Sequence, residues 1–197
     1  MAVLGLVLAG GGGQRMGGRD KARLALAGEP LIAHVCRRLS PQVDRLAVSG
    51  REDYGSGLPV IADRADGVKG PLAGLAAAIV WLESQSDRPA FDAIATAPVD
   101  TPFLPRDLVR RLQEPGGAAI AETAGGLQPV FGYWPIADLM RHRRLLEGEG
   151  GVAMAAFADA AGAVRVRFED ERAFLNVNRP EDLATAETLL KARRFSD

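Results

Sequence analysis

Several residue types that carry protein chemistry are scarce in this chain of 197 residues. It has one cysteine, Cys36, which excludes an intramolecular disulfide and suits a reducing cytoplasm. Cys36 lies in a helix-like segment, so we expect it to pack in the core. The two histidines, His34 and His142, also lie in helical patterns, away from the motifs described below. We expect no catalytic role for either histidine.

Long apolar runs and an excess charge are also missing. The apolar run at the N-terminus is only about seven residues long and has no basic leader, and the alanine-rich run at 72–82 is too short to span a bilayer. We therefore expect neither a signal peptide nor a membrane span, and a cytoplasmic location. The formal net charge of −1, from 24 basic and 25 acidic residues, gives no global attraction for nucleic acid or an anionic membrane. Any anion-binding site must be local.

The size and the hydrophobic pattern predict one α/β domain over residues 1–197. A hydrophobic content of 47% is enough for a substantial core. Strand-like runs alternate with helical patterns, which predicts a mainly parallel sheet covered on both faces, with ligands at the carboxyl ends of its strands. The predicted strands are 3–8, 45–49, 58–62, 91–97, 117–122, 128–134, 164–168 and 174–177, and the predicted helices are 30–39, 70–84, 105–112, 136–146, 150–159 and 180–193.

A glycine-rich segment follows the first predicted strand. It reads Leu8-Ala9-Gly10-Gly11-Gly12-Gly13-Gln14-Arg15-Met16-Gly17-Gly18-Arg19-Asp20-Lys21. Backbone without Cβ atoms lets consecutive N–H groups point at an anion, and Arg15 and Lys21 add positive charge. No three glycines of the segment have the spacing i, i+2 and i+5, so the dinucleotide-binding motif is absent. No Gly-Lys-Ser or Gly-Lys-Thr follows the glycines, so the P-loop motif is absent too. The segment predicts a polyphosphate cradle of another kind.

Two aspartates follow other predicted strands. Asp63 comes after 58–62 and Asp100 after 91–97, so both are expected at the same sheet edge as the glycine-rich segment. Taken alone, Asp100 is as readily a turn residue. A carboxylate that faces a triphosphate is costly unless a cation lies between them, and Mg²⁺ binds through carboxylates and phosphate oxygens. We therefore predict Asp100 as a ligand of Mg²⁺.

Two further segments carry polar or small residues in an unusual order. Gly70-Pro71-Leu72-Ala73-Gly74 opens a predicted helix, and its ordinary interpretation is a tight helix start that allows close packing. Asn176-Val177-Asn178-Arg179-Pro180-Glu181-Asp182-Leu183 precedes and begins the last predicted helix. Asparagines two apart in an extended segment point to one face, so both can contact one ligand, and the alternative is a turn that caps the helix.

Taken in order, these blocks resemble the nucleotidyltransferase superfamily, and within it most closely the molybdenum cofactor guanylyltransferases, over nearly the whole chain. The resemblance implies a three-layer α/β/α Rossmann-like fold. It also implies transfer of GMP from GTP to the terminal phosphate of molybdopterin with release of pyrophosphate, Mg²⁺ as the metal, and transient contacts with other proteins of molybdenum cofactor biosynthesis. The chain departs from the usual family pattern at Gly13, Val99 and Arg179, and Gln128-Pro129 falls in a variable segment.

Residue roles follow from the same resemblance. Arg15, Lys21 and Asp100 are expected to be catalytic, with Asp100 holding the metal, and Gln128, Asn176 and Asn178 to bind the acceptor. The expected GTP-binding residues are Leu8, Ala9, Gly10, Gly11, Gly12, Gly13, Arg15, Lys21, Asp63, Gly70, Pro71, Leu72, Gly74 and Asp100.

Three alternatives stay open at this point. A pterin cytidylyltransferase tends to have Leu-Ala-Ala-Gly in the first loop and to lack Gly-Pro-Leu-Ala-Gly, whereas this chain has the guanine-type residues in both places. A nucleotidyltransferase acting on another phosphorylated metabolite, such as a sugar phosphate, is less favoured for a chain of 197 residues. A non-catalytic guanine-nucleotide sensor would normally have lost Lys21 or Asp100, and both are present.

Overall fold

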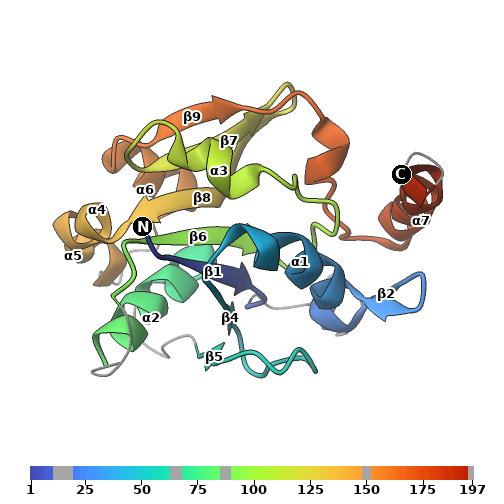
Figure 1. The fold of residues 1–197 in the computed structure, drawn as a ribbon, viewed down its shortest axis with the longest axis horizontal. Helices are drawn as coiled ribbons and strands as arrows, with labels where there is room; N and C mark the ends of the chain where they lie inside the picture. The colour runs from blue at the N-terminus through green and yellow to red at the C-terminus, as the bar shows by residue number, and fades with distance from the viewer. Residues whose placement is uncertain (11–19, 63–67, 85–89, 148–151, 195–197) are drawn as a thin grey trace.

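A computed structural model describes residues 1–10, 20–62, 68–84, 90–147 and 152–194. A seven-stranded sheet forms its centre, with strands in the order β5-β4-β1-β6-β8-β7-β9 (Figure 1). The strands are β1 Val3–Leu8, β4 Arg45–Ser49, β5 Val60–Ile61, β6 Ala93–Pro98, β7 Ala119–Thr123, β8 Gly126–Pro135 and β9 Val164–Arg167. A separate hairpin pairs β2 Ala25–Leu26 with β3 Glu29–Pro30.

The chain order changes direction between β1 and β6. The chain runs outward from β1 to β4 and β5 in parallel pairs, then returns to place β6 parallel to β1 on the other side. Strand β8 then pairs antiparallel with β6, and β7 lies between β8 and β9. Leu8 and Pro98 are register partners, so the carboxyl ends of β1 and β6 lie side by side. Open α/β sheets bind ligands at such a switch point.

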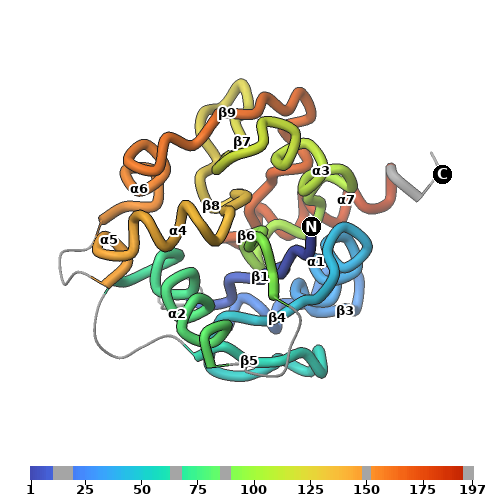
Figure 2. The backbone as a smooth tube through the Cα atoms, turned by 60° about the vertical axis from the view of Figure 1, so that its left-hand side comes forward, coloured from blue at the N-terminus to red at the C-terminus, as the bar shows by residue number. Residues whose placement is uncertain are grey.

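Helices cover both faces of the sheet, as predicted. One face carries α1 Leu31–Leu39, α3 Leu108–Gln113 and the short helix η4 Glu171–Phe174, and the other carries α2 Pro71–Glu83, α4 Ile136–Arg141, α5 Arg143–Glu147 and α6 Met154–Ala160. Figure 2 shows α2, α4, α5 and α6 on one side of the strands and α1 and α3 on the other. The architecture is a three-layer α/β/α fold.

The sequence of β1 explains why both faces are covered. Val3 and Val7 point into the core under α1 and α3, whereas Leu4, Leu6 and Leu8 point into the core under α2. A strand with apolar side chains on both faces is stable only when both faces are buried. The alternation of side chains along a strand therefore selects a central position in the sheet for this apolar run.

The last helix, α7 Pro180–Arg194, packs away from the sheet. A third apolar cluster joins it to the β2–β3 hairpin and contains Leu26, Leu31, Phe103, Val177 and Ala186. The hairpin was not predicted from sequence. Its two turn residues, Ala27 and Gly28, have φ of 51° and 84°, and a two-residue turn with both φ positive matches the twist of a hairpin.

Several predicted elements differ from those in the structure. The strand predicted at 174–177 is wrong: η4 ends at Phe174, and the only backbone bond that Val177 donates goes, within the described residues, to the Asp100 carbonyl at 2.8 Å. The helix predicted at 136–146 is two helices, interrupted at His142 with φ of −104°. Pro30 is the last residue of β3 and the N-cap of α1, not its first helical residue, because its ψ of 148° is extended.

Three other features of the sequence now have a place. Cys36 packs against the core beside α1's buried side chains, and burial raises the pKa of its thiol to about 11, so it stays protonated at neutral pH. His34 and His142 each lie within hydrogen-bond distance of a backbone carbonyl, Leu26 and Asp138 respectively. Among the residues that the structure describes, none of the helices combines the length and apolar character needed to cross a membrane.

Candidate functional site

A cavity of about 430 Å³ opens at the carboxyl ends of β1 and β6. The end of β1, the start of α2, the end of β6, the first half of β8 and the segment before α7 all contribute to it. Its lining residues are Leu8, Ala9, Gly10, Asp20, Lys21, Pro71, Pro98, Val99, Asp100, Gln128, Pro129, Val130, Phe131, Asn176 and Asn178. The fold therefore brings the described residues of the glycine-rich segment, the start of α2, Asp100 and the two asparagines before α7 to one cavity, as their motifs predicted. Gln128 and Pro129 complete its lining.

Lys21 lies at the centre of the polar groups in this cavity. Its Nζ forms an ion pair with Asp100 Oδ2 at 2.9 Å and also donates a hydrogen bond to Asn178 Oδ1. The Lys21 side chain is 29% exposed and that of Asp100 is 15% exposed, so the pair lies at the wall of the cavity within reach of a ligand. Asp100 and Asn178, which lie 79 and 157 positions after Lys21 in the sequence, thus meet at the Lys21 ammonium group.

The segment after β6 is fastened to the segment before α7. The buried Thr101 hydroxyl donates to Asn176 Oδ1 at 2.9 Å, and the Val177 N–H donates to the Asp100 carbonyl at 2.8 Å. Together with the Lys21 bridge, these bonds fix Asp100 and Asn178 relative to each other. Asn176 lines the cavity, but its carbonyl oxygen also has this structural partner, which the sequence did not predict.

Asp182 caps the start of α7, where Arg179 precedes Pro180. Its Oδ2 accepts hydrogen bonds from the backbone N–H groups of Asn178 and Arg179, both at 2.9 Å. An acidic side chain in the first turn that reaches back to the cap N–H is one half of a capping box. The start of α7 is thereby capped, and Asn178 is held where Lys21 contacts it.

Asp100 has one carboxylate oxygen left over. Its Oδ1 is buried and has no hydrogen-bond partner among the described residues. A buried acceptor without a partner costs about 1–3 kcal/mol, so its position calls for a ligand. A carboxylate oxygen of this kind fits Mg²⁺, which binds through one or two carboxylates plus phosphate oxygens and water. The described residues contain no cluster of three or more histidine, cysteine or acidic side chains.

The other predicted residues fall into three groups. Leu8, Ala9, Gly10, Pro71 and Gln128 line the cavity. Leu72 is 1% exposed and packs in the core under α2, and Gly70 caps that helix with φ of 70°, which favours glycine. Gly11, Gly12, Gly13, Arg15 and Asp63 lie outside the described residues, so their roles stay predictions.

Gly74 has a packing role that its sequence motif only partly indicated. A Cβ built on Gly74 would overlap Ser49 Oγ and lie 2.6 Å from Leu8 Cδ2, where α2 crosses β4 and β1. Glycine therefore allows the helix to approach the strand ends that form the cavity.

We predict that Gly74→Ala lowers the free energy of unfolding by about 1–3 kcal/mol, because overpacking outweighs the gain in helix propensity of about 1 kcal/mol. Gly117→Ala is the matched control, since nothing lies within 4 Å of a Cβ built there. Urea unfolding of both variants measures the difference. Equal stability of Gly74→Ala and the unchanged protein contradicts the packing role.

Asp20 lines the cavity without having been predicted to do so, and the buried Tyr54 lies near its charge. Asp20 caps the short helix η2 Lys21–Arg23 by accepting a bond from the Ala22 N–H at 3.0 Å, and its side chain also bonds to the Tyr54 hydroxyl. Tyr54 is 5% exposed and has a φ of 52°, a strained value for an aromatic residue. Burial, followed by the nearby Asp20 charge, raises the pKa of Tyr54. No motif marks Tyr54, because its proximity to Asp20 depends on the fold bringing the loop after β4 to that residue.

The fold and the cavity define a class. A mainly parallel sheet with a ligand-sized cavity at its switch point and a glycine after β1 is the arrangement in which open α/β domains bind nucleotides, and the Lys21–Asp100 pair lines this cavity. The chain belongs to a family within that class, since residues 5–166 match the sequence model described as the MobA-like NTP transferase domain.

Individual relatives extend this result. The chain is 48% identical to a molybdenum cofactor guanylyltransferase of Cereibacter sphaeroides, over 97% of this chain and 98% of that protein. It is 38% identical to one of Mesorhizobium japonicum, over 96% and 97%. Among solved structures, molybdopterin-guanine dinucleotide biosynthesis protein A of Archaeoglobus fulgidus superposes with a TM-score of 0.70 at 22% identity, covering 96% of this chain and 99% of that one. This last similarity concerns the fold alone.

Proposed function

We propose that this protein is a GTP-dependent molybdenum cofactor guanylyltransferase, with GTP and molybdopterin as substrates and the cytoplasm as its location. The observation that carries the proposal is the Lys21 ammonium group fixed between Asp100 and Asn178 in the cavity at the switch point of the sheet. Membership of the MobA-like NTP transferase family supports this proposal, and so do the relatives named molybdenum cofactor guanylyltransferase.

The reaction joins two anions. An oxygen of the terminal phosphate of molybdopterin attacks the α-phosphorus of GTP, a new P–O bond forms, and the bond from the α-phosphorus to the bridging oxygen breaks to release pyrophosphate. A phosphate monoester is largely a dianion at neutral pH, because its second pKa is about 6. The attacking group therefore needs no protein base, and positioning and charge neutralisation carry the catalysis.

Several residues that line the cavity have a part in this reaction. Gly10 offers a backbone N–H without a Cβ in the way, and Lys21 neutralises phosphate charge. Asn176, Asn178 and Gln128 line the same cavity and would contact the acceptor. Because Asp100 and Asn178 already hold the Lys21 ammonium in place, little reorganisation is needed when the triphosphate binds.

Asp100 is the residue that would hold Mg²⁺. Its buried Oδ1 has no partner among the described residues and its Oδ2 is already engaged by Lys21, so one oxygen remains for the ion. When bound there, Mg²⁺ neutralises charge on the phosphate oxygens as a Lewis acid.

Thermal shift with the four nucleoside triphosphates tests the base preference. We expect GTP with Mg²⁺ to raise the melting temperature more than CTP, ATP or UTP at equal concentration, because a ligand stabilises the native state according to its affinity. Pro71, beside the cavity at the start of α2, belongs to the segment that carries the guanine-type residues. A larger shift with CTP would move the chain to the cytidylyltransferase alternative.

A further inference from the structure

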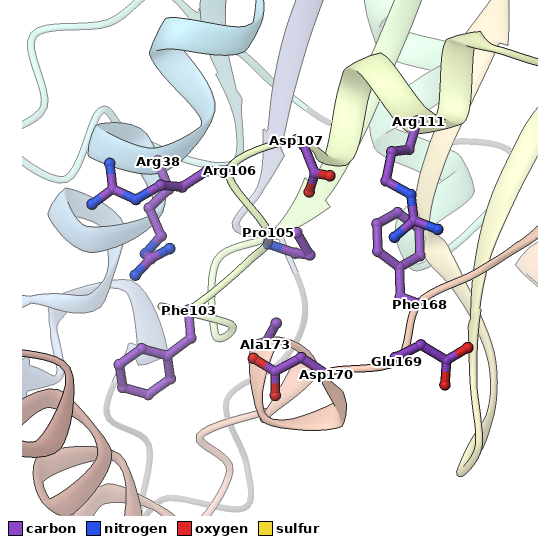
Figure 3. A pocket seen from close by; sticks show the side chains of 10 residues that line it. All are labelled: Arg38, Phe103, Pro105, Arg106, Asp107, Arg111, Phe168, Glu169, Asp170 and Ala173. Carbon is purple, nitrogen blue, oxygen red and sulfur yellow. The ribbon is translucent and has the colours of Figure 1, made fainter. Parts of the chain in front are cut away.

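Thr101 adjoins two residues that line the cavity at the carboxyl ends of β1 and β6, the first cavity, but does not line it itself. It follows Asp100 in the chain, contacts Asn176 and is 0% exposed. Figure 3 shows the continuation of its segment, from Phe103 to Asp107, along a second cavity of about 530 Å³, and the described lining of that cavity does not include Thr101 either. A ligand in either cavity therefore cannot touch the Thr101 hydroxyl, so any effect of this hydroxyl on a ligand must pass through another residue.

The residue through which Thr101 can act is Asn176. The Thr101 hydroxyl donates to Asn176 Oδ1 at 2.9 Å, across 75 positions of the sequence. A carboxamide has two different ends, an oxygen that accepts hydrogen bonds and an NH2 group that donates them. Because Thr101 occupies the oxygen, the NH2 group is the end of Asn176 that remains for a ligand. Asn176 is exposed and lines the first cavity, so its side chain is within reach of a ligand there.

Asn178 has the same arrangement two residues further along the chain. Its Oδ1 accepts a hydrogen bond from Lys21 Nζ, which leaves its NH2 group for a ligand. Val177, between the two asparagines, is 0% exposed and donates its backbone N–H to the Asp100 carbonyl at 2.8 Å, so the backbone that carries both side chains is fixed. Both asparagines line the first cavity, and both of their carboxamide oxygens are bonded to donors of the protein. This side of the cavity therefore offers hydrogen-bond donors.

We propose that Thr101 is a positioning residue, which holds the Asn176 carboxamide with its NH2 group toward the terminal phosphate of molybdopterin. This inference rests on the proposed function, which makes that phosphate the attacking group. A phosphate monoester is largely a dianion at neutral pH, and its oxygens accept hydrogen bonds. A carboxamide turned the other way would present its own oxygen to these oxygens, and the two would repel each other. The Thr101 hydroxyl thus selects the favourable end of Asn176 before the substrate binds, which lowers the cost of ordering this side chain on binding.

Two substitutions separate the hydroxyl of Thr101 from the packing of its side chain. Valine replaces the hydroxyl by a methyl group at nearly the same volume, whereas serine keeps the hydroxyl and loses the methyl group. We expect Thr101→Val to lower kcat/KM for molybdopterin about three- to tenfold, the size of one net hydrogen bond, and to change KM for GTP less than about twofold. Thr101→Ser should stay within about twofold of the unchanged protein in both quantities, because it restores the donor to Asn176.

A double-mutant cycle tests whether the effect passes through Asn176. In the Asn176→Ala background, Thr101→Val should change kcat/KM for molybdopterin by less than about twofold, because the carboxamide that Thr101 positions is gone. A role in packing alone predicts the same loss in both backgrounds. Thr123→Val is the matched control, since Thr123 is a buried threonine whose hydroxyl donates to the Gly126 carbonyl and which does not line the described part of the first cavity. It should leave both kinetic quantities unchanged.

Side-chain signals in nuclear magnetic resonance test the positioning without any turnover. Asn176 and Asn178 are the only asparagines of the chain, so labelling of asparagine with ¹⁵N gives the signals of two carboxamide NH2 groups, and Asn176→Ala assigns them. We expect ¹⁵N relaxation to show a restricted Asn176 carboxamide in the unchanged protein and in Thr101→Ser, and a mobile one in Thr101→Val. The Asn178 NH2 group, whose oxygen is bonded to Lys21 instead, is the internal reference.

Three results would overturn the proposal. They are an equal kcat/KM for molybdopterin in Thr101→Val and the unchanged protein, an equal loss in the Asn176→Ala background, and an Asn176 carboxamide that is as restricted in Thr101→Val as in Thr101→Ser. The melting temperature of each variant verifies its fold, and Thr101→Ala, which also lacks the hydroxyl, repeats the test if Thr101→Val does not fold.

The same experiments separate this proposal from the proposed function. If the unchanged protein forms the guanine dinucleotide and any of the three results is found, only the role of Thr101 is removed. If the unchanged protein forms no dinucleotide, the proposed function fails, and the mobility of the Asn176 carboxamide then decides alone whether Thr101 positions it.

Discussion

Asp100→Asn lowers the turnover of pterin guanine dinucleotide at least a hundredfold, by about 2.7 kcal/mol of transition-state stabilisation, while GTP affinity changes much less. The substitution keeps the shape of the side chain but removes its negative charge. That charge pairs with Lys21 at 2.9 Å and would attract Mg²⁺ through the buried Oδ1. The effect should therefore fall on the step in which charge moves, more than on binding.

The measurement separates the two quantities. Turnover is followed as product formation from GTP and molybdopterin, and affinity by calorimetry with GTP. Asp107→Asn is a matched control, because Asp107 lies on the same segment but outside the first cavity. If Asp100→Asn turns over as fast as the unchanged protein, Asp100 is only a turn residue. If neither protein turns over although both bind GTP, the sensor alternative gains.

Lys21→Ala weakens GTP binding or turnover at least tenfold, because loss of a charge-assisted contact costs about 1.5–3 kcal/mol. The structure adds a second reason. Removal of the ammonium leaves Asp100 Oδ2 and Asn178 Oδ1 without the group that joins them, so the cavity loses its fixed geometry.

Lys191→Ala serves as the control for Lys21→Ala, since Lys191 is an exposed lysine on α7. Steady-state kinetics with varied GTP and a circular dichroism spectrum of each variant complete the comparison. A folded Lys21→Ala protein with unchanged kinetics would falsify the role given to Lys21.

Much of the fold could be predicted because its signals are local. The apolar run of β1 appears in the structure with the bounds expected from sequence, and so does β4, because central strands buried on both faces have continuous apolar sequences. The proximity of the glycine-rich segment and Asp100 could be expected from the rule that parallel strands share one edge. The contact of Asn178 with Lys21 could not be expected in this way, because the segment before Asn178 forms no strand.

The parts that could not be predicted depend on contacts between distant segments. The β2–β3 hairpin is two residues long on each side, too short for a period-2 pattern. Residues 174–177 have strand-like composition, but Thr101 and Asp100 hold that segment through bonds that no single-sequence pattern contains. Tyr54 likewise has no local signal, since its hydroxyl meets Asp20 only after the sheet has formed.

The most direct test of the proposed guanylyltransferase activity is to incubate the purified protein with molybdopterin, Mg²⁺ and either GTP or CTP, and to identify the products by mass spectrometry. We expect pterin guanine dinucleotide and pyrophosphate from GTP, with at most a trace of the cytosine dinucleotide from CTP. Preferential formation of the cytosine dinucleotide, or GTP binding without any dinucleotide product, would contradict this activity.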